Sequence, residues 1–237
     1  MNLSKIMHQI FVVAKKCCFY SKEFRFHRSY SQYGEDLLLQ GFLDDKWSWD
    51  YKGFWVDIGA HHPRNLSNTM AFSVNGWRGI NVDASFDAIE LFKRKRKRDI
   101  NVNVGIGLQP GELDYYRMSS SPMNTFSKEF AEHAAKEGVK ILEVVKVPVI
   151  TMKELLDKHL PVGQHIDFVS IDCEGLDLSI LQSNDWDKYR PDYILIEIHT
   201  EGRNWEIPTC PVTQYLNERG YAFVGQGYVT TLYKRVR

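Results

Sequence analysis

Short apolar runs alternate with amphipathic stretches along most of the chain. The stretches with apolar residues at helical spacing predict helices at 34–43, 65–75, 84–97, 151–159, 176–182 and 212–219. The apolar runs predict five core strands, at Phe54–Ile58, Ile80–Val82, Ile100–Ile106, Ile166–Ile171 and Tyr193–Ile198. Strands that are apolar on both faces are typical of a parallel sheet covered by helices on each side. The pattern therefore predicts an α/β fold.

The C-terminal part departs from this alternation. Tyr221–Val224 and Tyr228–Tyr233 flank the turn Gly225-Gln226-Gly227, which indicates an antiparallel hairpin. Two further strands are predicted at Leu113–Met118 and Glu143–Ile150, in a less regular stretch after the third core strand. Because no linker interrupts the pattern, we expect one domain over residues 30–237. Its sheet is expected to be mostly parallel, with a C-terminal antiparallel hairpin.

Composition, net charge and cysteine spacing narrow the class of protein further. The chain has 237 residues, of which 43% are apolar and 25% charged, as in soluble globular domains. Its formal net charge of zero gives no global indication of a nucleic-acid partner. Its four cysteines show no CxxC spacing, which favours a reducing compartment and predicts a cytoplasmic protein.

Residues 1–29 form a separate basic arm in the sequence. Its apolar run, 6–14, is far shorter than the roughly 20 residues of a membrane span. Two interpretations are open. The arm can be an amphipathic segment that lies on the inner face of an anionic membrane through residues 1–28, or a helix that packs on the domain or on a second subunit of a homo-oligomer. The cations from Lys5 to Arg28 are Lys5, Lys15, Lys16, Lys22, Arg25 and Arg28, against Glu23 alone.

A second basic run, Lys93–Arg98, resembles a nucleic-acid patch when taken alone. It falls in the last turn of the helix predicted at 84–97, where cations oppose the helix dipole. We therefore interpret it as a helix end and expect no nucleic-acid partner.

Two strands end in acids, which suggests a ligand site. Asp57 and Asp83 close the first and second core strands, and ligands of open α/β sheets bind at that edge. The turn after the first strand has a single glycine, Gly59, and a proline, Pro63, so it offers few free amides to a diphosphate. No phosphate-loop motif occurs. A ligand bound through hydroxyls and an amino-acid moiety fits better, and S-adenosylmethionine is such a ligand.

Several motifs in register carry a resemblance to a known family. In chain order the motifs are Ser31-Gln32-Tyr33-Gly34-Glu35-Asp36, Val56–Pro63 with Ser67-Asn68-Thr69, Gly76–Ala84, Asn124-Thr125-Phe126, Ile166–Gly175, Asn184-Asp185-Trp186 and Tyr189-Arg190-Pro191. With these motifs the chain resembles the FkbM family of S-adenosylmethionine-dependent methyltransferases over roughly residues 30–199. The resemblance implies a Rossmann-like, seven-stranded methyltransferase sheet and O-methylation, commonly of sugars in surface glycans or secondary metabolites.

The resemblance also implies which residues bind S-adenosylmethionine. Asp83 is the expected partner of the ribose hydroxyls, and Ala84 leaves room for adenine. Gln32 and Glu35 either help to close the pocket over the cofactor or serve only to start a helix. The remaining residues implied in cofactor binding are Asp57, Gly59, Ala60 and His61 after the first strand, Gly105 and Ile106 beside the adenine, and Asp172.

The chemistry is expected where the fourth and fifth core strands end. A sugar hydroxyl has a high pKa, so a general base or a nearby cation assists its methylation. We expect Asp172 to act as the base or to position the acceptor, with Glu174, Glu197 and His199 beside it. Glu174 and Glu197 would suit Mg²⁺, or would only hydrogen-bond the cofactor or backbone. His61 and His62 are less suited to a metal, because adjacent side chains at a turn diverge.

The acceptor is expected to be a sugar or glycan. Two polar loops, 119–126 and 201–210, are candidates for its pocket; they contain Asn124, Arg203, Asn204 and Trp205. A methyltransferase that acts on a protein or a small non-sugar metabolite would share the same cofactor residues. A non-catalytic binding domain of the same fold would be expected to lose Asp57 or Asp83, and both are present.

Overall fold

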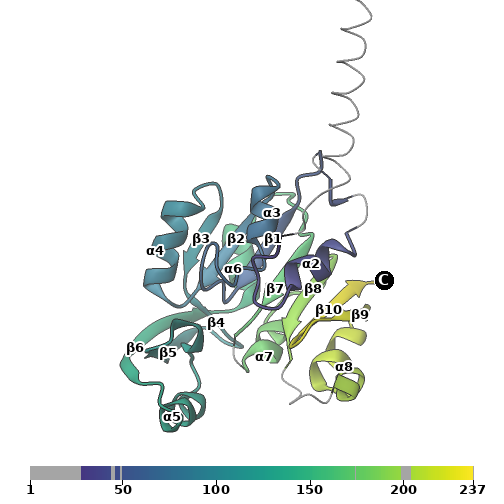
Figure 1. Cartoon of the computed structure of the whole chain (residues 1–237). Helices are drawn as coiled ribbons and strands as arrows, with labels where there is room; N and C mark the ends of the chain where they lie inside the picture. The colour runs from purple at the N-terminus through teal and green to yellow at the C-terminus, as the bar shows by residue number, and fades with distance from the viewer. Residues whose placement is uncertain (1–27, 44–45, 49, 174, 199–203, 237) are drawn as a thin grey trace, which may run out of the picture.

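The computed structural model describes residues 28–43, 46–48, 50–173, 175–198 and 204–236, with the backbone alone at 204–205. A seven-stranded sheet forms its centre, in the order β3-β2-β1-β7-β8-β10-β9 (Figure 1). β1, β2, β3, β7 and β8 pair in parallel, whereas β10 pairs antiparallel with both β8 and β9. This confirms the mostly parallel sheet with a C-terminal hairpin. The strands are β1 (Phe54–Ile58), β2 (Arg78–Asp83), β3 (Ile100–Asn103), β7 (Phe168–Ile171), β8 (Tyr193–Glu197), β9 (Tyr221–Gln226) and β10 (Thr230–Arg235).

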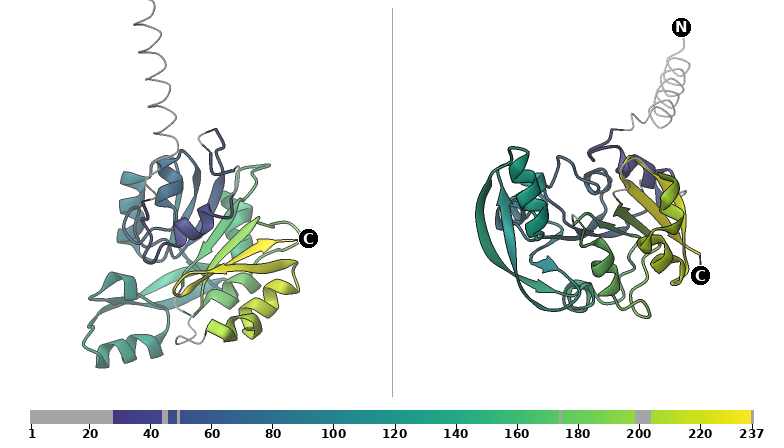
Figure 2. Two further views of the ribbon diagram at one scale, coloured as in Figure 1. Left: turned by 45° about the vertical axis from the view of Figure 1, so that its right-hand side comes forward. Right: turned by 90° about the horizontal axis from the view of Figure 1, so that it is seen from below.

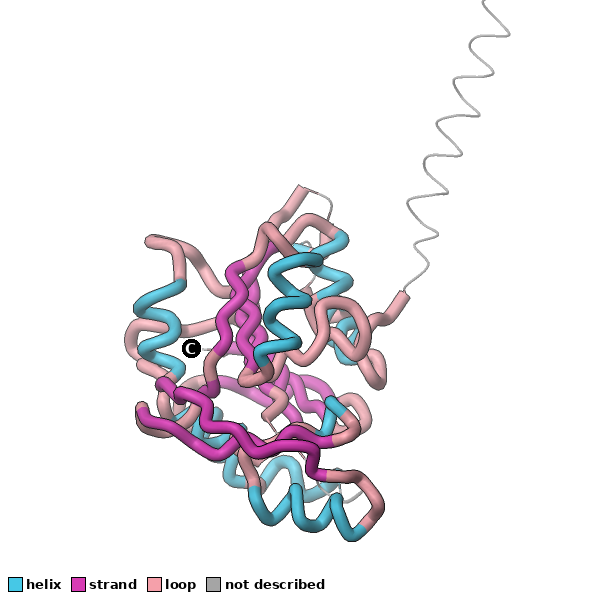
Figure 3. Tube along the Cα trace, turned by 90° about the vertical axis from the view of Figure 1, so that its left-hand side faces the viewer, coloured by secondary structure: helices cyan, strands magenta, loops and turns pink. Residues whose placement is uncertain are grey.

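Helices cover both faces of the sheet, as the apolar strands require. On one face, alternate strand residues such as Val56 and Ile194 pack against apolar side chains of α6, α7 and α8. On the other face, Trp55 and Phe168 pack against α2 and α3, and α4 lies over β2 and β3 (Figure 3). The helices are α2 (Glu35–Gln40), α3 (Met70–Val74), α4 (Phe86–Lys95), α6 (Met152–His159), α7 (Asp177–Gln182) and α8 (Pro211–Asn217).

Local signals account for several helix ends. Thr151 and Glu154 form a reciprocal capping box at the start of α6. Ser85 caps α4 by accepting from the amide of Ala88. The helix predicted at 65–75 is confined to α3, because Leu66 lies at φ 54°, outside the right-handed helical region.

The third core strand differs from the prediction. The run Ile100–Ile106 is divided between two sheets, β3 in the main sheet and β4 (Gly105–Ile106) in a second sheet of order β4-β6-β5. At the division the amide of Val104 still bonds to the carbonyl of Asp83, and β4 then pairs in parallel with β6. The second sheet is completed by β6 (Ile141–Ile150) and β5 (Gly111–Met118).

One helix, α5 (Lys128–Lys136), was not predicted from the sequence. Ser127 caps it by accepting from the amide of Phe130, and its buried face consists of Ala131 and Ala134 against Met118. Its buried face is made of alanines instead of large apolar side chains. Together β4, β5, α5 and β6, with the short helix η2 (Ser121–Met123), form what we call the insert. Figure 2 shows the insert in teal at one edge of the sheet, on the side away from the C-terminal hairpin.

The basic run Lys93–Arg98 contains a buried arginine. Helix α4 ends at Lys95, as expected for a cationic last turn. Arg96, however, is only 5% exposed; it forms an ion pair with the equally buried Asp99 at 2.7 Å and lies over the Trp55 ring at 5.0 Å. It also donates to the carbonyl of Pro63 at 3.1 Å. Arg96 therefore joins α4 to the first strand and to the turn that follows it.

The expectations for the N-terminal arm fall almost wholly outside the described residues and stay predictions. Within the described part of the chain, no helix is long and apolar enough to cross a membrane.

Removal of the Arg96 side chain should destabilise the protein strongly. Arg96→Ala leaves Asp99 buried without its cation, which typically costs about 3–5 kcal/mol in the free energy of unfolding. Urea denaturation followed by circular dichroism measures this change. The matched control is Lys97→Ala, an exposed cation of the same run, which should stay within about 0.5 kcal/mol of the native chain. Equal effects of the two substitutions would contradict the structural role of Arg96.

Candidate functional site

A cavity of about 1110 Å³ opens at the carboxyl edge of the sheet, between the insert and the C-terminal hairpin. The right-hand view of Figure 2 looks from below and shows these two parts on opposite sides. Nearly all the cofactor residues expected from the sequence line this cavity, although they come from distant parts of the chain. They are Gln32, Asp57, Gly59, Ala60, His61, Asp83, Ala84, Gly105, Ile106 and Asp172.

Gly59 allows the floor of the cavity to form. It lies at φ 81°, a conformation that favours glycine. A Cβ atom at this position would overlap the carbonyl oxygen of Asp172, in the loop that follows β7. The turns after β1 and β7 can therefore approach closely only because residue 59 has no side chain.

Asp83 ends β2 and is held in place by backbone amides. Its Oδ2 accepts from the amide of His61 at 2.8 Å, and its Oδ1 accepts from the amide of Ser85 at 2.7 Å. The carboxyl is 9% exposed, and burial raises its pKa. Each carboxylate oxygen has a further lone pair, so Asp83 can still accept from hydroxyl donors in the cavity.

Asp57 also lines the cavity and is more deeply buried than Asp83. Its Oδ2 accepts from the hydroxyl of Thr69 at 3.0 Å, and the side chain is 4% exposed. Burial raises the pKa of Asp57 to about 6, against the opposing effects of Thr69 and Arg96. A cationic group in the cavity would stabilise the ionised form of this acid.

The two histidines of the first turn have different surroundings. The Nδ1 atom of His62 accepts from the amides of Arg64 and Asn65, which gives this ring a local structural role. His61 has φ 50°, and its Nε2 lies 3.2 Å from the hydroxyl of Ser121 in the insert. Burial lowers the pKa of both rings. Their ring centroids are 6.2 Å apart.

Glu35 has surroundings that bear on the two interpretations left open by the sequence. It does not line the cavity, although its neighbour Gln32 does. The buried Glu35 carboxylate instead accepts from the amide of Tyr33 at 2.9 Å, within its own turn. Glu35 therefore supports the structural interpretation of this segment.

The acids expected to carry the chemistry are partly described. Asp172 and Glu197 both line the cavity, from the ends of β7 and β8, and Cys173 lies beside them with its pKa raised by burial. Glu174 and His199 lie outside the described residues, as does Arg203 of the expected acceptor loop. The expectation of Mg²⁺ at Glu174 and Glu197 gains no support from the structure.

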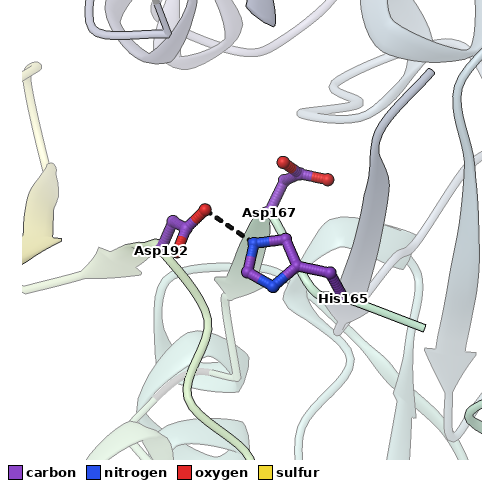
Figure 4. Close-up of side chains that lie close together, drawn as sticks. All are labelled: His165, Asp167 and Asp192. Atoms are coloured by element: carbon purple, nitrogen blue, oxygen red, sulfur yellow. Dashed lines mark hydrogen bonds and ion pairs between the residues drawn. The ribbon is translucent and has the colours of Figure 1, made fainter. Parts of the chain in front are cut away.

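The described residues contain one group with the spacing of metal ligands, His165, Asp167 and Asp192, at the opposite edge of the sheet. The Nε2 atom of His165 lies 2.6 Å from Asp192 (Figure 4). Two cations already compensate these acids. Lys46 lies 2.9 Å from Asp167 and 2.7 Å from Asp192, and Arg235 lies 2.6 Å from Asp192. The cluster is therefore an ion-pair network that joins the N-terminal segment to the starts of β7 and β8.

The sequence did not identify several residues of the cavity wall. Tyr115 and Arg117 line it from β5, and Tyr33 and Tyr228 from the segments before α2 and between β9 and β10. Alternate residues of a strand share a face, so Tyr115 and Arg117 lie on the same face of β5. This alternation is the only local feature of the sequence that groups these two residues. Asn124, expected in the acceptor pocket, also lines the cavity.

The sheet order, its single antiparallel strand and an acid-lined cavity at the carboxyl edge define a Rossmann-like methyltransferase fold. The family model described as "Methyltransferase FkbM domain" matches residues 57–223. The chain belongs to the FkbM methyltransferase family.

Other comparisons add little to this assignment. Among solved structures, the "Crystal structure of monomeric WbdD" is similar, with a TM-score of 0.43 and 10% identity. The match covers 88% of this chain and 42% of that one, so the chain spans less than half the length of WbdD. A likeness this low carries no functional argument. A search of curated proteins finds no match.

Neutralisation of Asp57 should make stability less sensitive to pH. The pKa of this acid rises from about 3.9 in the unfolded chain to about 6 in the fold. Its ionisation therefore weakens the native chain as pH rises through this window. Relative to the native chain, Asp57→Asn should gain about 2 kcal/mol in the free energy of unfolding between pH 4 and pH 7. Urea denaturation across this range measures the difference, and parallel pH profiles would contradict it.

Proposed function

We propose that this protein is an S-adenosylmethionine-dependent O-methyltransferase that acts on a sugar hydroxyl. The observation that carries the donor assignment is Asp83, a buried acid with spare acceptor capacity at the wall of the cavity. An acid in this position can accept from both hydroxyls of a ribose. The FkbM family match supports methyl transfer, and the resemblance to sugar-modifying members supports the acceptor class.

The residues of the cavity fit the proposed donor. Next to Asp83 the wall is small and apolar, with Ala84, Ala88 and Ile106, as an adenine ring requires. Asp57 would compensate the positive charge of the methionine amino group. The glycine at 59 leaves the floor free of a side chain beside these two acids.

When bound, S-adenosylmethionine supplies a methyl group on a sulfonium centre. The protein has to align an acceptor hydroxyl with that methyl group and to take up the hydroxyl proton. Asp172 is exposed and lines the cavity, so its carboxylate is the proposed proton acceptor. Glu197, at the end of the neighbouring strand, is proposed to hydrogen-bond the acceptor.

Substitution of Asp83 should weaken donor binding. Asp83→Asn removes the charge-assisted hydrogen bonds to the ribose, worth about 1.5–3 kcal/mol, so the dissociation constant of S-adenosylmethionine should rise about 10- to 150-fold. Isothermal titration calorimetry on the full chain measures this constant. Glu90→Gln is the matched control, because Glu90 lies on α4 outside the cavity and pairs with Lys93 on the surface.

Two outcomes would reject the donor assignment. One is a native chain that fails to bind S-adenosylmethionine or that binds NAD tightly. The other is an Asp83→Asn variant with the affinity of the Glu90→Gln control. Turnover is tested with isotope-labelled S-adenosylmethionine and a panel of saccharides, in which mass spectrometry detects the transferred methyl group.

A further inference from the structure

The cavity has two ends, and the proposed donor occupies one of them. Asp57, Asp83 and Gly105 belong to the end formed by β1, β2 and β4, whereas Glu197 and Tyr228 belong to the end formed by β8 and the β9–β10 turn. The volume of about 1110 Å³ exceeds the range of about 300–1,000 Å³ that is typical of a site for one drug-sized ligand. A second molecule therefore has room beside the donor.

Two tyrosine rings are in contact at this second end. The ring centroids of Tyr33 and Tyr228 are 4.7 Å apart, and the planes are tilted by 51°. Both rings line the cavity, yet Tyr33 is 50% and Tyr228 is 70% exposed. The pair thus presents aromatic surface that the protein itself leaves uncovered, in a place where a ligand can cover it.

The backbone that carries Tyr33 is fixed by its own turn. The amide of Tyr33 donates to Glu35, and Gly34 makes the turn possible at φ 92°. Asp36 accepts from the hydroxyl of Ser31 at 2.9 Å and from the amide of Tyr30 at 2.8 Å. Glu35 and Asp36 do not line the cavity, because their carboxylates bind the backbone and side chains of this turn. In this way the two acids hold Gln32 and Tyr33, which do line the cavity.

The turn that carries Tyr228 is fixed from the other side. The amide of Gly227 donates to the carbonyl of Thr230 at 2.8 Å, and the amide of Ile198 donates to the carbonyl of Val229 at 2.8 Å. The two rings are therefore held on anchored backbone from opposite ends of the chain. Because the site is already ordered, less conformational entropy is lost when a ligand binds.

The charge of the cavity limits what can bind there. Among the cavity-lining residues that the structure describes, Arg117 is the one with a permanent positive charge. It is already paired with Asp87 and Glu143, each at 2.7 Å. The second end itself carries the acid Glu197. A phosphate group there would meet this acid without a spare cation in the described wall.

We propose that Tyr33 and Tyr228 form the acceptor subsite, which takes an uncharged saccharide ring packed by its C–H face against the two phenol rings. Sugar phosphates and nucleotide sugars should bind more weakly, since the described part of the wall offers them no spare cation. Gln32, which lines the cavity next to Tyr33, is placed to hydrogen-bond the ring hydroxyls. This inference rests on the proposed function and specifies its substrate class.

Saturation-transfer NMR tests the subsite directly. The probes are methyl glycosides of common hexoses, 6-deoxyhexoses and N-acetylhexosamines, together with hexose 1-phosphates and UDP-hexoses. Each is added to the full chain saturated with S-adenosylhomocysteine. Ring C–H protons of at least one neutral glycoside should receive saturation, and the phosphorylated probes should not.

Variants then locate the binding surface. Loss of each ring, in Tyr33→Ala and in Tyr228→Ala, should weaken glycoside binding about 2- to 12-fold. The double Tyr→Phe variant keeps both rings and should keep the saturation signal. Phe86→Ala is the matched control, since Phe86 is an aromatic residue on α4 that is 63% exposed and does not line the cavity.

The outcomes separate this inference from the proposed function. Absence of glycoside binding, tighter binding of the phosphorylated probes, or an unchanged signal in the double Tyr→Ala variant would overturn the subsite. If S-adenosylhomocysteine still binds in calorimetry, only the subsite fails. If it does not bind to the native chain, the proposed function fails first.

Discussion

The site depends on one close approach between backbones, at the point where β1 ends. The amides of Gly59 and Ala60 both donate to the carbonyl of Val82, and the amide of Asp172 donates to the carbonyl of Ile58. These bonds tie the carboxyl ends of β2, β1 and β7 together, and they require a residue without a side chain at position 59. The acids at the three strand ends therefore have fixed positions relative to one another. This close approach of the turns after β1 and β7 forms the floor of the cavity.

Much of the donor end of the site could be predicted from the sequence. Each acid directly follows or ends an apolar run, so the strand pattern alone places Asp57, Asp83 and Asp172 at one edge of the sheet. The lone glycine of the first turn and the capping box of α6 are likewise local signals. Local signals are reliable where neighbours in sequence are also neighbours in space.

The remaining features depend on contacts between distant segments. The division of Ile100–Ile106 between two sheets follows from the pairing of Gly105 with Val149, which no local pattern reveals. Helix α5 has a buried face of alanines, and Tyr33 meets Tyr228 from the opposite end of the chain. The hydrogen bond from the Tyr33 amide to Glu35 is likewise a detail that the sequence left open between two interpretations. An acid in a motif near a site can support a neighbour's backbone instead of facing the ligand.

The division of the predicted third strand assigns its two halves to different sheets, the main sheet and the sheet of the insert. The main sheet continues through β3 and resumes at β7, and it fixes the donor end without any contribution from residues 107–150 to its strand pairing. The insert closes on itself through β5 and β6 and contributes only a wall of the cavity. Changes of sequence in the insert beyond Ile106 can therefore alter one wall of the cavity while the acids at the strand ends keep their positions.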